Sequence, residues 1–159
     1  MRHAARVIVF DPQGRVLLIR GHDVDEPERS WWFTIGGGIE TGEETAQAAV
    51  REFYEETGLV ISPSDLQGPV FHRTAVFEFA KKQIVQRETF YFVHLESAFE
   101  PDFTRWTQLE RETIDEVKWW DIAELHNCAQ EVFPLNLAQL LENLRHGWDG
   151  VAIEIVEGP

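Results

Sequence analysis

The stretch Gly37 to Leu59, GGIETGEETAQAAVREFYEETGL, decides how the fold of this chain is interpreted. It opens with glycines, continues with residues of high helix propensity, and reaches Gly58, a residue type common just beyond a helix C-terminus. Thr41 and Glu44, three residues apart, match a capping box at the helix N-terminus. These features predict a helix from about Glu43 to Thr57.

One side of this predicted helix is acidic. At about 100° per residue, Glu52, Glu55 and Glu56 fall within an arc of roughly 100°, and apolar side chains occupy the opposite side. Like charges three or four residues apart destabilise a helix by about 0.2–0.5 kcal/mol per pair, so this face calls for a cation. Arg51 neutralises part of the charge. The remainder suits Mg²⁺, which proteins bind through carboxylates together with substrate phosphates.

A solvated surface is the commoner explanation of an acidic helix face. Here the glycines at 36–38 and the arginine within the acidic cluster argue against it, because a solvated face requires neither. Glycines also let the main chain approach a ligand closely, which makes a backbone carbonyl available to a metal ion.

The spacing of these residues resembles the Nudix box. Gly37 is followed after five residues by Glu43, after seven more by Arg51-Glu52-Phe53, and then by Glu55-Glu56 and Gly58-Leu59. On this resemblance the chain is identified as a member of the Nudix hydrolase superfamily. The resemblance implies an α/β fold, the Nudix-type α/β/α sandwich with a mixed β-sheet and a loop-helix-loop catalytic motif, as a single domain over residues 1–159.

The resemblance also implies the chemistry and the roles of the box residues. The expected reaction is Mg²⁺-dependent hydrolysis of a phosphoanhydride bond in a nucleoside diphosphate linked to another moiety, with Mn²⁺ as a possible substitute. The expected metal ligands are Glu52, Glu55, Glu56 and the Gly36 carbonyl. Arg51 is expected to orient the glutamates through charge-assisted hydrogen bonds, with Glu43 as its partner.

A residue outside the box is expected to help activate the water or hold the metal. Glu116 is our choice for both roles because it precedes the VKWW strand, and Glu112 is the second choice. The acidic residues from 110 to 116 are equally compatible with a solvated loop.

Substrate contacts are harder to predict than the box. The candidates carried forward are Arg20, Arg29, Trp32 and Arg87, with Arg73 and Arg105 as further arginines. A role at the surface or the edge of the core competes with each of them. Adjacent tryptophans in a strand point to opposite faces, so at most one of Trp31 and Trp32 faces the site.

Composition limits the partners. A net charge of −14 over 159 residues disfavours a nucleic acid polymer, whereas a small phosphorylated nucleotide carried with Mg²⁺ is compatible. Cys128, the single cysteine, excludes an internal disulfide and fits a reducing compartment. No signal peptide and no long apolar segment is recognisable, so we expect a cytoplasmic protein that does not bind membranes. A homodimer is expected from base rates alone.

The flanking sequence predicts strands on both sides of the helix. A hairpin is predicted from Ala4–Phe10 and Arg15–Arg20, and further strands over residues 31–34, 70–79, 84–95, 117–120 and 151–156. A helical turn begins after Asp121 and a leucine-rich helix after Pro134. Loops are predicted over residues 21–30, 61–68 and 96–108.

A different class of function is also compatible with the fold, namely a non-catalytic sensor or regulatory Nudix module that binds a nucleotide. Missing box glutamates would favour it, and the box is complete.

Overall fold

The computed structural model describes residues 1–97, 99 and 106–157. In chain order the elements are β1 (Arg2–Phe10), β2 (Val16–His22), β3 (Ser30–Gly38), α1 (Thr45–Thr57), the 3₁₀ turn η1 (Pro63–Asp65), β4 (Gln67–Phe79), β5 (Lys82–His94), α2 (Gln108–Thr113), β6 (Ile114–Trp120), α3 (Ile122–His126), β7 (Glu131–Val132), α4 (Leu137–Arg145) and β8 (Ile153–Glu157).

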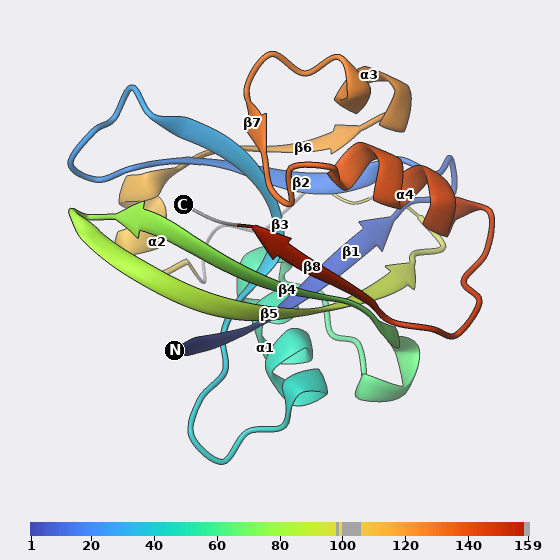
Figure 1. Cartoon of the computed structure of the whole chain (residues 1–159). Helices are drawn as coiled ribbons and strands as arrows, with labels where there is room; N and C mark the ends of the chain where they lie inside the picture. The colour runs from blue at the N-terminus through green and yellow to red at the C-terminus, as the bar shows by residue number, and fades with distance from the viewer. Residues whose placement is uncertain (98, 100–105, 158–159) are drawn as a thin grey trace.

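The strands form one mixed sheet in the order β6-β2-β3-β1-β5-β4-β8, with β7 paired to β3. Strand β3 joins two arms of this sheet, because residues 30–34 pair with β2 and residues 35–38 pair with β1. Figure 1 shows the two arms, with β6 and β2 above and β5, β4 and β8 below. The box glycines therefore end the strand that connects the arms.

The predicted N-terminal hairpin is only partly correct. Asp11 and Gly14 close the turn through a backbone hydrogen bond of 3.0 Å, and Asp11 Oδ1 accepts the Arg15 N–H at 2.8 Å. Beyond Phe10 and Val16, however, β1 and β2 separate, and β3 lies between them in the sheet. The apolar runs on either side of the turn identified the strands, but they carry no information about which strand pairs with which.

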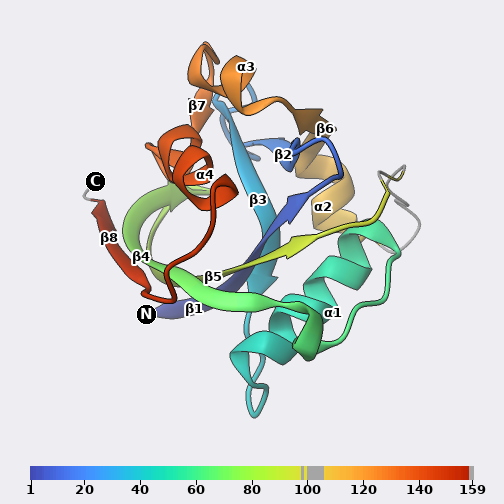
Figure 2. The ribbon, with the colours of Figure 1, turned by 90° about the vertical axis from the view of Figure 1, so that its right-hand side faces the viewer.

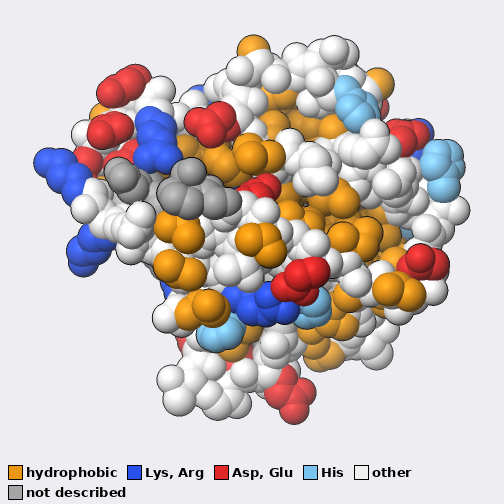
Figure 3. Space-filling view, viewed as in Figure 1, with side chains coloured by type: hydrophobic (Ala, Val, Ile, Leu, Met, Phe, Trp, Pro, Cys, Tyr) orange, Lys and Arg blue, Asp and Glu red, His pale blue; other side chains and the backbone are white. Residues whose placement is uncertain are grey.

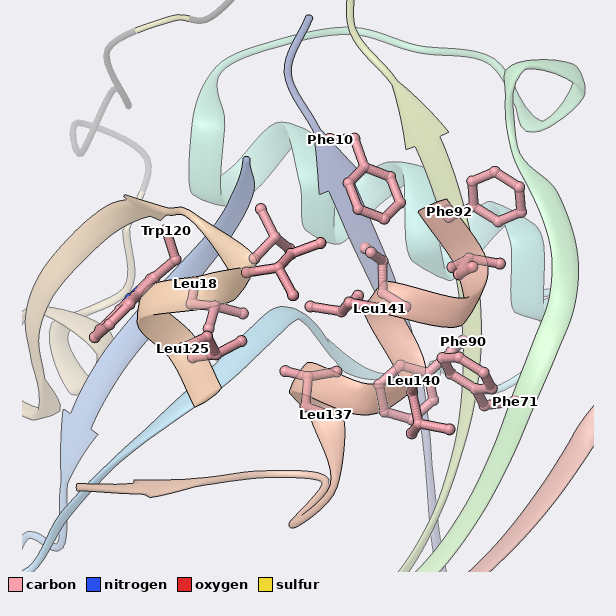
Figure 4. Packing of buried hydrophobic residues seen from close by; sticks show 14 of the residues in the cluster. Phe10, Leu18, Phe71, Phe90, Phe92, Trp120, Leu125, Leu137, Leu140 and Leu141 are labelled. Carbon is pink, nitrogen blue, oxygen red and sulfur yellow. The ribbon is translucent and has the colours of Figure 1, made fainter. Parts of the chain in front are cut away.

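The sheet is covered on both faces, which confirms the α/β/α sandwich. In Figure 2, α1 and α4 lie on opposite sides of the sheet. Along β5, Tyr91 and Val93 pack with the α1 side chains, whereas Phe90 and Phe92 belong to the cluster that α3 and α4 cover. Figure 4 shows the leucines of α4 meeting the rings of Phe10, Phe90 and Phe92 in this second cluster.

Short elements account for most differences from the sequence-based expectation. The strands over 117–120 and 31–34 extend to Ile114–Trp120 and Ser30–Gly38. Helix α2 was not predicted. Its N-cap is Thr107, whose hydroxyl accepts the Glu110 N–H at 3.1 Å, so the Thr-x-x-Glu spacing was the available signal. The predicted loop over 96–108 falls partly outside the described residues.

The face drawn in Figure 3 carries hydrophobic side chains between α4 and β8. Leu140, Leu144, Trp148 and Ile153 line a hollow of about 140 Å³ there. Among the described residues, no helix is both long and apolar enough to cross a bilayer.

Candidate active site

The glycines at the end of β3 make room for other groups. A Cβ on Gly36, whose φ is +146°, would lie 2.1 Å from the Ala5 carbonyl oxygen. A Cβ on Gly37 would lie 2.6 Å from the carboxyl carbon of Glu52. The contact at Gly36 involves backbone that cannot move aside, so β3 reaches Ala5 only because residue 36 lacks a side chain. A side chain at position 37 would instead displace the Glu52 carboxylate.

Helix α1 begins two residues later than predicted. Its N-cap is Glu44, whose N–H donates to Gln47 Oε1 at 3.0 Å, so the expected pairing of Thr41 with Glu44 is wrong. The C-terminus is as predicted: Gly58 adopts a left-handed conformation with φ of 79°, and its N–H donates to the Tyr54 carbonyl at 2.8 Å. Apolar burial fixes the helix on the sheet and orients its acidic side.

Arg51 connects the parts of the acidic cluster. Its Nε and Nη2 donate to the two oxygens of Glu43 at 2.8 and 3.0 Å, a bidentate pair. Its Nη1 donates to Glu52 Oε1 at 2.9 Å and lies 3.4 Å from both oxygens of Glu55, and its Nη2 also reaches the Gly38 carbonyl at 2.9 Å. One guanidinium thus links three glutamates to the glycine strand.

The glutamates differ in burial and in electrostatic state. Glu56 is only 4% exposed, and the Gly36 N–H donates to its Oε2 at 3.3 Å. Burial, followed by repulsion from Glu52 and Glu110, raises the pKa of Glu56 well above the ordinary value. Burial and then Glu55 also raise the pKa of Glu52, although Arg51 opposes the shift. Glu43 shows the reverse, since the Arg51 hydrogen bond lowers its pKa.

These raised pKa values fit a cation site. Crowded, partly buried carboxylates are stabilised either by protons or by a positive ion, and an all-oxygen ligand set suits a hard divalent cation. In the described part of the chain, no three Asp, Glu, His or Cys side chains already converge as a metal-binding group.

The acidic cluster lines a cavity of about 390 Å³. This volume is within the usual range for small-molecule sites, roughly 300–1,000 Å³. The lining includes Glu52, Glu55, Glu56 and Glu110, the glycines 36–38, the arginines Arg2, Arg6, Arg29 and Arg73, and the rings of Trp31, Phe33, Phe90 and Phe133. The cavity thus combines acidic, basic and aromatic surfaces.

A buried ion-pair network lines another part of the cavity. The Glu88 carboxylate accepts hydrogen bonds from Arg6 Nε at 2.7 Å, from Gln86 Nε2 at 2.9 Å and from Arg73 Nη1. Arg73 Nε also donates to Glu157 of β8 at 2.6 Å. Burial alone would raise the pKa of Glu88, but the charges and hydrogen bonds of Arg6 and Arg73 lower it.

Several predicted site residues lie away from the cavity lining. Trp32 is 2% exposed within the core and donates to Gln130, whereas its neighbour Trp31 lines the cavity. Arg20 packs over the Trp32 ring at 5.9 Å. Arg87 pairs with Glu154 of β8. Of the four predicted substrate contacts, Arg29 alone is placed in the lining, and it packs over Trp31 at 5.6 Å.

The predicted base is also outside the cavity lining. Glu116 is directly opposite Arg20 in the β2–β6 pair, its Oε1 lies 3.5 Å from Arg20 Nε, and its side chain is 46% exposed. Glu112 accepts from Gln108 on the α2 surface. Glu110, two residues earlier in the same helix, lines the cavity instead. Of the two further predicted arginines, Arg73 lines the cavity, and Arg105 lies outside the described residues.

Sequence reasoning missed Arg2, Arg6, Gln86 and Glu88. No local pattern marks them, because they reach one another across the parallel pairing of β1 with β5, which the sequence does not specify.

The fold and the cavity together define a class: a mixed α/β domain in which a glycine strand and an acidic helix border a ligand-sized cavity. The chain belongs to the family described as the NUDIX domain, whose sequence model matches residues 1–144. This confirms the family resemblance drawn from the box. Nudix hydrolases generally use divalent metal ions and act on nucleotide-derived substrates.

Individual relatives match over short segments. An octanoyltransferase of Myxococcus xanthus is 41% identical over 80 residues, which is 50% of this chain and 21% of that protein. An RNA pyrophosphohydrolase of Brucella ovis is 48% identical over 46 residues, 29% of this chain and 25% of that protein. The chain thus spans a quarter or less of the length of these curated relatives.

The fold matches over the whole chain. A MutT protein of Bacillus halodurans superimposes with a TM-score of 0.65 at 17% identity, covering 100% of this chain and 92% of that one. This likeness establishes the architecture.

Proposed function

We propose that this protein is a Mg²⁺-dependent hydrolase that cleaves a phosphoanhydride bond in a nucleoside diphosphate linked to another moiety. The observation that carries the proposal is that one cavity is lined by the box glutamates, by arginines and by aromatic rings. Burial, followed by repulsion from neighbouring carboxylates, raises the pKa values of Glu52 and Glu56, which supports a cation there. A cation and a phosphorylated aromatic ligand together satisfy these surfaces.

The box residues receive the roles expected from the family resemblance. Glu52, Glu55 and Glu56 would hold the metal, with the Gly36 carbonyl as a further ligand. When bound, Mg²⁺ neutralises phosphate oxygens and lowers the pKa of a water molecule. Arg51 fixes Glu52 and Glu55 through its fork of donors, and Glu43 fixes Arg51.

A carboxylate must accept the proton of the attacking water. Glu55 is suited to this because its side chain is 36% exposed and therefore accessible from the cavity. Glu110, which lines the same cavity, replaces Glu116 as our choice outside the box. The water oxygen bonds to phosphorus, the bond from phosphorus to the bridging oxygen breaks, and the two phosphate products leave.

The nucleoside would occupy the aromatic part of the cavity. Trp31, Phe33, Phe90 and Phe133 all line it, and aromatic side chains are suited to stacking on a base. The negative charge of the chain favours a small nucleotide over a polymer. The name of the Brucella relative, RNA pyrophosphohydrolase, makes an RNA the competing substrate to test.

The experiment is a substrate panel assayed with Mg²⁺ and with Mn²⁺. It comprises an ADP-sugar, a dinucleoside polyphosphate, nucleoside triphosphates and a short 5′-triphosphorylated RNA. We expect metal-dependent turnover of a nucleoside diphosphate derivative that is lost in Glu55→Gln. Binding of a nucleotide without turnover of any compound would instead support the non-catalytic sensor.

Two further expectations complete the proposal. We place the protein in the cytoplasm, for which the single cysteine is the support. We also propose a homodimer, which sedimentation velocity at micromolar concentration tests directly.

A further inference from the structure

Arg2 lines the same cavity as the box carboxylates Glu52, Glu55 and Glu56. The parallel pairing of β1 with β5 sets Arg2 directly beside Gln86, and Arg2 Nη1 donates to Gln86 Oε1. On the β3 side, a Cβ on Gly38 would lie 3.0 Å from Arg2 Nη2. The guanidinium is therefore held between a glutamine and a glycine, both of which line the cavity with it.

The charge of Arg2 is balanced differently from that of its neighbours. Arg6 and Arg73 both form ion pairs with Glu88. Among the described residues, Arg2 forms no such pair, and its hydrogen bond is to the neutral amide of Gln86. Burial, followed by repulsion from Arg6, lowers the pKa of Arg2, while Glu52 opposes the shift. An arginine keeps its proton in proteins, so this positive charge is available to an anion in the cavity.

Gln86 is held firmly enough to position a neighbour. It is 1% exposed, and its Nε2 donates to the buried Glu88 carboxylate at 2.9 Å, which leaves its Oε1 directed at Arg2. A buried amide is costly unless its polar atoms are paired, so Arg2 and Glu88 together account for a glutamine here. Glu88 is fixed in turn by Arg6.

We propose that Arg2 binds the phosphate groups of the substrate beside the box carboxylates, and that Gln86 positions it. This rests on the proposed function, since the ligand is the diphosphate that the metal would also contact. The planar guanidinium can donate to two phosphate oxygens at once, which an ammonium group cannot do. Gly38 contributes by leaving space for the guanidinium.

The test measures binding of methylenediphosphonate, a non-hydrolysable diphosphate without a base, by calorimetry in the presence of Mg²⁺. Hydrogen bonds to charged groups contribute about 1.5–3 kcal/mol, so Arg2→Ala is expected to weaken binding by at least about tenfold. Arg2→Lys should recover part of this loss. Gln86→Leu should weaken binding less than Arg2→Ala and should add little to it in the double variant, because the two residues act as one unit.

Two controls separate this role from a structural one. Arg145→Ala, on the surface of α4, should leave diphosphonate binding unchanged. The affinity for Mg²⁺ alone should stay the same or rise in Arg2→Ala, because a positive charge near Glu52 is removed. If Arg2→Ala changes Mg²⁺ affinity but not diphosphonate affinity, Arg2 only compensates Glu52 and the proposal is overturned.

The outcome can be distinguished from failure of the proposed function. If the wild type binds the diphosphonate through Arg2 but hydrolyses nothing in the panel, the role of Arg2 stands and the proposed hydrolase activity is overturned. If a panel substrate is hydrolysed equally well by the wild type and by Arg2→Ala, the hydrolase activity stands and the role of Arg2 is overturned. Absence of diphosphonate binding in the wild type would overturn the role of Arg2.

Discussion

The acidic and the basic parts of the cavity solve the problem of buried charge in opposite ways. Around Glu88, one carboxylate receives hydrogen bonds from two arginines and an amide, and its pKa is lowered. Around Glu52 and Glu56, one arginine serves several carboxylates, and the pKa values of both are raised. The first group is complete within the protein, whereas the second requires a proton or an external cation. This incomplete compensation is the electrostatic support for the cation site proposed above.

The largest effect on stability is expected from removing the charge of Glu88, the carboxylate that the protein compensates fully. Glu88→Gln should lower the free energy of unfolding by about 3–5 kcal/mol at neutral pH, because two arginines lose their buried partner. Chemical denaturation of the variant and the wild type measures the difference. A loss below about 1 kcal/mol would mean that the network is not a stabilising unit.

The pH dependence of this variant gives the sign of the effect. A carboxylate whose pKa is lowered in the folded protein contributes stability above the unfolded pKa, about 4.3 for glutamate, and loses it as pH falls toward the folded pKa. The stability difference between wild type and Glu88→Gln should therefore be constant near neutral pH and should shrink below about pH 4. A difference that grows on acidification would contradict the lowered pKa.

Removing a crowded carboxylate should have the reverse effect on stability. Glu56→Gln is expected to unfold at the same or a higher temperature than the wild type without metal, since a disfavoured buried charge is lost. Its metal-dependent turnover should fall by more than about a hundredfold, beyond the usual effect of residues that only orient ligands. Unfolding curves with and without Mg²⁺ supply the internal control, because the variant should lose the stabilisation by metal.

Arg51→Lys tests whether the acidic cluster depends on the hydrogen bonds of Arg51 or only on its positive charge. Lysine keeps the charge but cannot donate simultaneously to Glu43, Glu52 and the Gly38 carbonyl. We expect activity to fall by about ten- to a hundredfold, the range typical of residues that orient metal ligands. Arg145→Lys serves as the matched surface control, and full activity in Arg51→Lys would show that charge alone suffices.

The smallest expected effects compare acidic residues outside the box. Glu116→Gln should change turnover by less than about twofold, since substitutions of exposed surface residues usually have small effects. Glu110→Gln, in the cavity lining, should reduce turnover clearly more. Steady-state kinetics on one substrate measure both variants. Equal effects would contradict the choice of Glu110 over Glu116 as the acidic residue that acts from outside the box.

The sequence predicted those parts of the site whose residues lie close together along the chain. Arg51 reaches Glu43, Glu52 and Glu55 within one helix and its lead-in, so spacing along the chain was sufficient. Strand alternation correctly predicted that Trp31 and Trp32 point to opposite faces of the sheet. The sequence did not show which of the two faces borders the cavity. The network from Arg2 through Gln86 joins residues 84 positions apart, and strand register alone brings them together.

Strand β3 carries Trp31 near one end and Gly37 near the other, with neighbouring strands hydrogen-bonded along its length. Six residues of extended chain span at most roughly 20 Å, at about 3.3 Å per residue. Under the proposed roles, with the ring of a ligand at Trp31 and its metal at the box glutamates, β3 would set the distance between these two ends of the ligand. The enzyme would then select its substrates by length as well as by chemical identity.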